Sequence, residues 1–269
     1  MAKELVFNKR SGILAAFTDT GLMIKRSSTH IIRNTDQLLG TFFQPIMFLL
    51  LFATVFGGAI SQALPAGITY LNFLMAGIIV QTLAFGSTTT AIAVCNDLTK
   101  GIVDRFRSLP MTQIAVVTGH VISDLFRNSL STIVMIVTGL VIGFRSSASF
   151  IEWLAIAGIL LLFTFMFSWL AAIVGILAKS VEGVQWLSFI IVFPLTFASS
   201  AFVPSEGMNH YLKAFVENQP ITHVIEAVRG LMLGTPTGNH ITMAILWCVG
   251  IIIVAVPLSL WLFNRKTKQ

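Results

Sequence analysis

Sixty consecutive residues, from Gln37 to Asn96, contain no Asp, Glu, Lys or Arg. Over the whole chain only 10% of residues are charged, against about 25% in an ordinary soluble domain. Because a helix needs about 20 mostly apolar residues to cross a bilayer, the charge-free stretch has room for two spans. With 55% hydrophobic residues and a mean hydropathy of +0.87, the sequence predicts an all-α membrane protein.

Apolar runs predict six transmembrane helices, at residues 38–60, 68–94, 112–144, 153–178, 185–203 and 240–263. We therefore divide the chain into a cytoplasmic N-terminal segment, residues 1–36, and a six-span transmembrane domain, residues 37–269. The N-terminal segment holds nine charges among recurring apolar residues. This pattern favours an amphipathic helix lying at the membrane interface over a loosely ordered basic tail.

The Lys and Arg residues indicate how the chain is oriented. With six spans, 13 of the 17 lie in segments on the side of the N-terminus and three on the other side. Positive residues gather in cytoplasmic segments, so we expect both termini and residues 96–111 in the cytoplasm of a cell-membrane protein. We then expect the basic residues behind the net charge of +6 to bind lipid head groups rather than nucleic acid.

The connection at residues 204–239 is longer than the others and contains Pro204 and Pro220. These prolines predict two short re-entrant helices on the outer side; such backbone is tolerated in the bilayer where protein or a water-filled cavity covers it. Glu226 and Arg229 lie three apart on one helical face. They are interpreted as part of an external gate, or as an ion pair that holds a surface cap.

Residues 97–109 predict a short cytoplasmic helix, with Asn96 as its N-cap and Pro110 at its end. Its charged face carries Lys100, Asp104 and Arg107, while Arg105 falls at the edge of the apolar stripe. Periodicity alone leaves two interpretations open: an interfacial loop, or a docking helix for a cytoplasmic partner.

Residues 97–111, DLTKGIVDRFRSLPM, and 119–130, GHVISDLFRNSL, resemble the permease subunits of type-2 ABC exporters, and most of all the daunorubicin-resistance permease family. Residues 202–234, beginning FVPSEGM, are similar to that family's connection before the last span. Asn209 and Gln219 depart from the family pattern, which has Pro and Asn at these places.

The resemblance implies that the protein is one half of a membrane channel. It would pair with a second permease, identical or different, and two copies of an ABC ATPase would dock on the pair. The segment after the second span would be the coupling helix, and residues 1–36 would supply the interfacial connecting helix. The resemblance assigns ATPase docking to Asp97, Lys100, Asp104, Arg105, Phe106 and Arg107.

The chain contains no G-x-x-x-x-G-K-[ST] phosphate-binding loop. ATP and Mg²⁺ are therefore expected on the partner ATPase, and this chain is expected to be neither an enzyme nor a cofactor-binding protein. The favoured cargo is an amphipathic, hydrophobic compound such as an antibiotic or a lipid-like molecule. A lipid-linked polysaccharide is the alternative, which a wide outer path with stacked aromatics would favour. An ion-coupled secondary transporter would need acidic residues deep in the spans, and we find none at the span centres.

His120, Asp124 and Arg127 share one face of the third predicted helix. They are interpreted as an Asp124–Arg127 pair near the membrane boundary, or as a charged link to the N-terminal helix or the ATPase. His223 and His240 are interpreted as surface residues, and no metal site is predicted. Polar residues within the spans predict either a substrate path or hydrogen bonds between helices: Gln44, Gln81, Thr88, Thr89, Thr90, Ser199 and Ser200.

Overall fold

The computed structural model describes residues 35–64, 67–100 and 113–266. The predicted interfacial helix and four predicted docking residues, Asp104, Arg105, Phe106 and Arg107, lie outside these ranges. Within them every regular element is a helix. The elements are α2 (Thr35–Leu51), η1 (Phe52–Phe56), α3 (Gly57–Ile60), η2 (Ser61–Ala63), α4 (Tyr70–Gly86), α5 (Thr88–Thr99), α7 (Gln113–Ile142), α8 (Phe150–Leu177), α9 (Val181–Phe197), η3 (Ser205–Gly207), α10 (His210–Asn218), α11 (Pro220–Leu233) and α12 (His240–Lys266).

Five stretches among the described residues are long and apolar enough to cross a membrane. They are Phe43–Ile60, Tyr70–Thr99, Val116–Ile142, Phe150–Leu177 and His240–Lys266. The chain is therefore an all-α membrane protein, as predicted. The remaining predicted span, residues 185–203, differs from the helix found there. α9 is apolar but has 17 residues and is shifted toward the N-terminus: Ser180 caps its start, and it ends at Phe197, three residues after Pro194.

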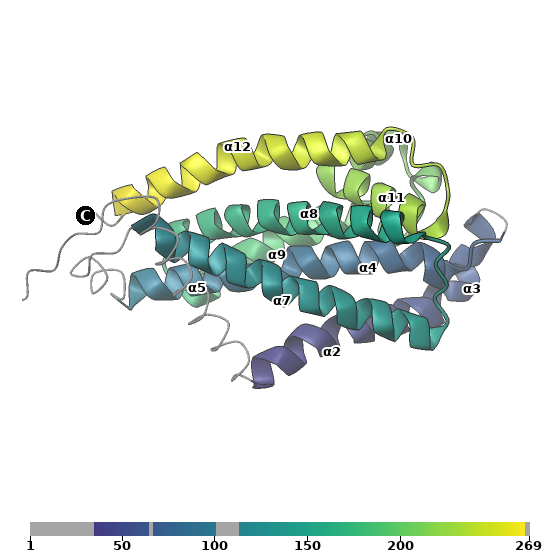
Figure 1. Cartoon of the computed structure of the whole chain (residues 1–269), viewed down its shortest axis with the longest axis horizontal. Helices are drawn as coiled ribbons and strands as arrows, with labels where there is room; N and C mark the ends of the chain where they lie inside the picture. Colours follow the sequence, from purple (N-terminus) through teal and green to yellow (C-terminus); the bar gives the residue numbers. More distant parts are fainter. Residues whose placement is uncertain (1–34, 65–66, 101–112, 267–269) are drawn as a thin grey trace, which may run out of the picture.

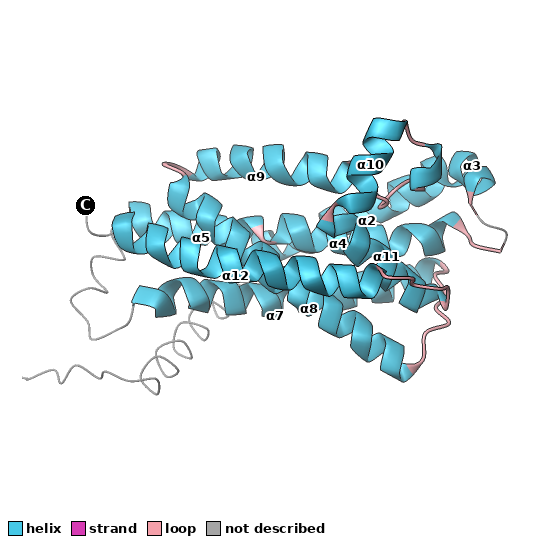
Figure 2. Ribbon diagram, turned by 90° about the horizontal axis from the view of Figure 1, so that it is seen from above, coloured by secondary structure: helices cyan, strands magenta, loops and turns pink. Residues whose placement is uncertain are grey.

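α4 and α8 form the centre of the bundle. Two-thirds of the apolar window of each is buried, against 17% for α12 and 6% for the first span. α7 and α12 pack along α8, while α9 packs against α4 and α5 on another side (Figures 1 and 2). Small residues permit the closest approaches: Gly175 of α8 lies so close to the Ala91 carbonyl of α5 that a Cβ would collide with it.

The two ends of the bundle differ in the segments that they hold. The end of α5, the start of α7 and the end of α12 lie together, whereas α3, α10 and α11 lie at the opposite end (Figure 1). Lys266 of α12 also donates to the Ala178 carbonyl, just beyond α8, at 3.1 Å. Lys100, which follows α5, and Lys266, the last residue of α12, therefore lie at the same end of the bundle.

Two helices, α10 and α11, occupy the connection between α9 and α12, as the prolines predict. Pro220 is the first residue of α11, where its missing N–H costs no hydrogen bond. α11 packs against α4, α8 and α12, and most of its residues are buried. This helix is therefore part of the core at its end of the bundle.

Candidate functional site

A cavity of about 510 Å³ lies between α2, the α4–α5 segment and α9. No charged residue and no histidine is among the described residues that line it. Its walls combine apolar ring faces with hydrogen-bonding groups, including three amides and several hydroxyls. The amides are those of Gln44, Gln81 and Gln185, and the rings are those of Phe48, Phe85, Phe189, Phe193 and Phe197.

A ladder of stacked phenylalanine rings extends from the wall of this cavity. The ring centroids of Phe193 and Phe197 are 4.2 Å apart, and those of Phe197 and Phe202 are 4.7 Å apart. Phe202 in turn lies 4.5 Å from Phe52 of η1. The Phe202 carbonyl accepts a hydrogen bond from Tyr70 at the start of α4, so the ladder runs from the cavity toward the end of the bundle that holds α10 and α11.

The second predicted span is broken beside the cavity. α4 ends at Gly86, α5 begins at Thr88, and Ser87 forms the turn between them. The Thr90 N–H donates to the Ser87 carbonyl, three residues back, at 3.0 Å. The Gly86 carbonyl accepts from the Thr89 hydroxyl and from Arg127 Nη2, each at 2.8 Å. A side chain of α7 therefore bonds the backbone at the break.

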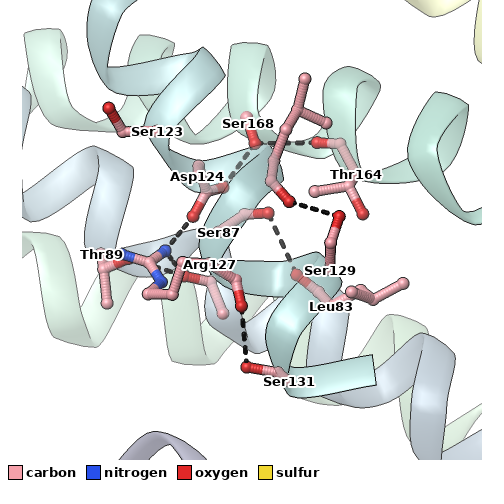
Figure 3. Close-up of polar contacts among 12 residues, drawn as sticks. Leu83, Ser87, Thr89, Ser123, Asp124, Arg127, Ser129, Ser131, Thr164 and Ser168 are labelled. Carbon is pink, nitrogen blue, oxygen red and sulfur yellow. Dashed lines mark hydrogen bonds and ion pairs between the residues drawn. The ribbon is translucent and has the colours of Figure 1, made fainter. Parts of the chain in front are cut away.

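Arg127 belongs to a buried polar cluster between α4, α7 and α8 (Figure 3). It pairs with Asp124 on the same helix, and the other carboxylate oxygen of Asp124 accepts from Ser168 of α8 at 2.5 Å. Arg127 is 7% exposed and Asp124 1%. The ion pair considered from the sequence is present and is buried inside the bundle. Asp124 lies within the apolar stretch Val116–Ile142, nearer its start than its centre.

Asp97 points into the bundle, where its carboxylate lies 2.8 Å from Nε2 of His120 on α7. The predicted helix start at residues 96–97 was wrong. Asn96 to Thr99 form the last turn of α5, and the Lys100 N–H donates to the Asn96 carbonyl. The helix continues because Val94 and Cys95 are buried against the bundle, and neither Pro nor Gly interrupts it before Gly101. Of the two predicted docking residues that the structure describes, Lys100 is exposed and Asp97 is buried.

Arg229 ties together three segments at the other end of the bundle. It pairs with Glu226 at 2.5 Å and donates to the carbonyls of Phe73, at 3.0 Å, and Ser200, at 2.6 Å. Its guanidinium also lies 3.7 Å from the centroid of the Phe73 ring. Glu226 and Arg229 thus form the expected pair, and Arg229 is buried. What this pair does in transport stays a prediction.

The interpretation of His223 as a surface residue was wrong. Its side chain is buried, and its Nδ1 lies 3.0 Å from Nδ1 of His240. The sequence gives little sign of this contact, because the two residues lie on different helices, separated by a connection. Among the described residues, no three side chains of His, Cys, Asp or Glu come together as metal ligands would.

Residues 18–233 match the model of the ABC-2 type transporter family. This match extends over most of the chain. The chain belongs to the ABC-2 type transporter family. The permease is 32% identical over 230 residues to a daunorubicin resistance ABC transporter permease of Streptomyces coeruleorubidus, an overlap of 86% of this chain and 80% of the relative. It is 27% identical over 246 residues to a Mycobacterium tuberculosis protein named "Probable doxorubicin resistance ABC transporter permease protein DrrC", with overlaps of 90% and 87%.

The family resemblance seen in residues 97–111 and 202–234 is thus confirmed. The permease is a membrane protein homologous to drug-resistance transporters, and its family works with an ABC ATPase. The sequence analysis did not identify the residues that join the helices around the buried cluster. Ser168 is one polar residue in a long apolar run and Gly86 is an ordinary glycine by composition, so neither carried a signal that could have assigned it.

Proposed function

We propose that this permease is the membrane-spanning part of an ATP-driven exporter, and that the cavity between α2, α4–α5 and α9 receives its cargo. The observation that carries the proposal is the lining of that cavity, which is uncharged among the described residues. A volume of about 510 Å³ is within the range of ~300–1,000 Å³ typical of small-molecule sites. Phenylalanine faces and glutamine amides suit an amphipathic, mainly hydrophobic compound.

A lipid-linked polysaccharide fits this cavity less well. The phosphate that joins such a glycan to its lipid requires cations or a cluster of backbone N–H groups, and the described lining offers no Lys, Arg or His. The stacked rings that would favour a glycan are present. Successive rings cover one another's faces, however, with interplanar angles of 24° and 29° along α9 and into Phe202, which leaves less face for a sugar.

Ion-coupled transport is disfavoured by the contacts of Asp124. Both of its oxygens are bonded, one to Arg127 and the other to Ser168. A carboxylate that carries protons or Na⁺ must exchange partners during each cycle, and an Arg three residues away on the same helix competes with that exchange.

The ATPase is proposed to dock on residues 100–107, without the buried Asp97, and to bind ATP and Mg²⁺, so that this chain itself carries no catalytic site or cofactor. A second permease is proposed to close the open side of the cavity.

We infer six spans, with α9 as the fifth. Its 17 residues extend about 26 Å at 1.5 Å per residue, which is close to the thickness of the hydrocarbon core. Both termini would then lie in the cytoplasm of the cell membrane, with α10 and α11 re-entering from the outer side near the Glu226–Arg229 pair.

Transport into inside-out vesicles tests the cargo assignment. The permease and its ATPase are co-expressed, and ATP-dependent uptake of daunorubicin, which is fluorescent, is measured. Phe193→Ala removes a cavity ring and should lower uptake several-fold, whereas Phe150→Ala, on an exposed ring outside the cavity, should not. Equal uptake by both variants, at equal membrane levels, would remove the cavity from the transport path.

A further inference from the structure

The wall of the cavity and the buried charged cluster meet at one oxygen atom. Gly86, Thr88 and Thr89 line the cavity from the α4–α5 break. The carbonyl oxygen of Gly86 accepts from the Thr89 hydroxyl on the cavity side and from the Arg127 guanidinium of α7. A buried cation and a residue that faces the cavity therefore bond the same carbonyl oxygen.

The Gly86 carbonyl at the break has two donors, of which Arg127 is the charged one. In a transmembrane bundle, a backbone carbonyl released by a helix break must find another donor, because lipid offers none. Arg127 supplies a charge-assisted donor, which is stronger than a neutral one. α7 packs directly on this backbone, since a Cβ at Gly86 would collide with the Asn128 side chain. The position of α7 therefore determines the geometry of the break.

Arg127 is itself held from the opposite side. Its partner Asp124 is bonded to Ser168, so the chain of contacts runs from α8 through α7 to the cavity wall (Figure 3). Ionisable groups inside a membrane bundle are costly and mark functional positions by default. Because Asp124 neutralises Arg127 and is itself bonded to Ser168, the donor that holds the Gly86 carbonyl is fixed in position from α8.

We propose that Arg127 is a positioning residue for the cargo cavity. By holding the Gly86 carbonyl it fixes the turn at Ser87, and hence the directions in which Thr88 and Thr89 present their hydroxyls to the cargo. This inference rests on the proposed function in one respect, the assignment of the cavity to cargo. It implies that Arg127 sets cargo affinity and selectivity without contacting cargo itself.

The decisive test compares a double variant, which removes the cation without leaving an unpaired charge, with a single variant that keeps the cation. Asp124→Asn combined with Arg127→Met keeps a hydrogen-bonding group beside Ser168 and makes the cluster neutral, while Arg127→Lys keeps a cation and a donor. In the vesicle assay, the double variant should raise the half-saturating daunorubicin concentration about tenfold, as expected for one charge-assisted hydrogen bond. Arg127→Lys should recover most of the affinity. Co-purification of the ATPase and the maximal rate should change little.

A second measurement needs no cargo. Thr88→Cys is introduced into a chain whose native Cys95 and Cys248, both buried, are replaced by Ala, and its labelling rate with a water-soluble maleimide is measured in membranes. The double variant should change that rate several-fold, and Arg127→Lys much less. An unchanged labelling rate in a double variant that folds would overturn the proposal. So would a lower maximal rate at an unchanged half-saturating concentration.

These two measurements separate the failure of this inference from that of the proposed function. If the wild-type vesicles take up no daunorubicin but the labelling rate responds to the double variant, the cargo assignment fails and the positioning role stands. If uptake responds to Phe193→Ala but neither measurement responds to the double variant, the cavity stands and the role of Arg127 is refuted.

Discussion

The carboxylate of Asp97 lies 2.8 Å from Nε2 of His120, and this contact joins the last turn of α5 to α7. The two helices therefore meet beside the segment that connects them, which is the segment proposed to dock the ATPase. We expect this contact to pass a movement of the proposed docking segment to both helices together.

A double-mutant cycle measures the strength of this joint. We expect Asp97→Ala and His120→Ala each to lower the melting temperature of the purified permease, and their combination to lower it by less than the sum. The expected coupling is about 1 kcal/mol, typical of one partly buried hydrogen bond. Lys100→Ala, at an exposed neighbouring position, serves as control and should leave the melting temperature unchanged. Additive effects at residues 97 and 120 would show that the contact contributes nothing.

Charge reversal in the proposed docking segment tests its role. Arg105→Glu with Arg107→Glu should reduce co-purification of the ATPase in mild detergent at least several-fold, because reversed charges repel the surface that Arg recognises. Lys213→Glu, at a half-buried position in α10 beside Glu217, is the charge-reversal control at the opposite end of the bundle and should leave the yield unchanged. Full recovery of the ATPase with the double variant would refute docking at residues 105 and 107.

Two glycines of α8 give a matched test of helix packing. Gly175→Ala should destabilise the permease by about 1–3 kcal/mol, the usual cost of overpacking, because its Cβ would collide with the Ala91 carbonyl. Gly158→Ala meets nothing within 4 Å and should be neutral or slightly stabilising, since Ala favours a helix. Thermal melts of both variants in detergent provide the comparison. Similar melting temperatures would mean that α5 and α8 are less tightly packed than the structure has them.

The His223–His240 contact predicts a dependence of stability on pH. Burial, and after it the neighbouring His240, lowers the pKa of His223, which lies in α11, outside the five candidate spans. The unfolded chain, with a His pKa near 6.5, then binds more protons than the folded one. Stability should be fully present above about pH 6.5 and fall as the pH drops below it.

Melting temperatures at pH 7.5 and pH 5.5 test this sign. The wild-type permease should lose stability at the lower pH, and His223→Asn should lose less. His210→Asn, at an exposed histidine, is the control and should behave as wild type. A His223→Asn variant with the full wild-type pH dependence would assign that dependence to other groups.

Hydropathy was enough to locate the long helices. α7, α8 and α12 each begin and end within about three residues of their predicted bounds, because each is apolar on average over its whole length and has polar ends. The break at Ser87 could not be predicted in the same way. The residues around it are small and uncharged, so the stretch Tyr70–Thr99 remains apolar on average while its backbone turns.

The direction of polar side chains was the least predictable property. Asp97 and Lys100 were predicted to make the same kind of contact, and the structure buries one and exposes the other. Their different surroundings depend on His120, a residue on another helix. The pairs Asp124–Arg127 and Glu226–Arg229 were predictable because each lies three residues apart on one helix. The carbonyls that both arginines bond are set by tertiary packing alone.

Because Asp124 and Arg127 are three residues apart on α7, their pair can form as soon as that helix does, before α8 has been synthesised. A lone charged side chain at the centre of a transmembrane helix adds about 2.5–3.5 kcal/mol to the free energy of insertion. A pair within one turn can enter the bilayer as a net neutral unit. Gly86, which is synthesised earlier, and Ser168, which is synthesised later, then bond to an ion pair that has already formed. Neither charge of the pair has to enter lipid alone.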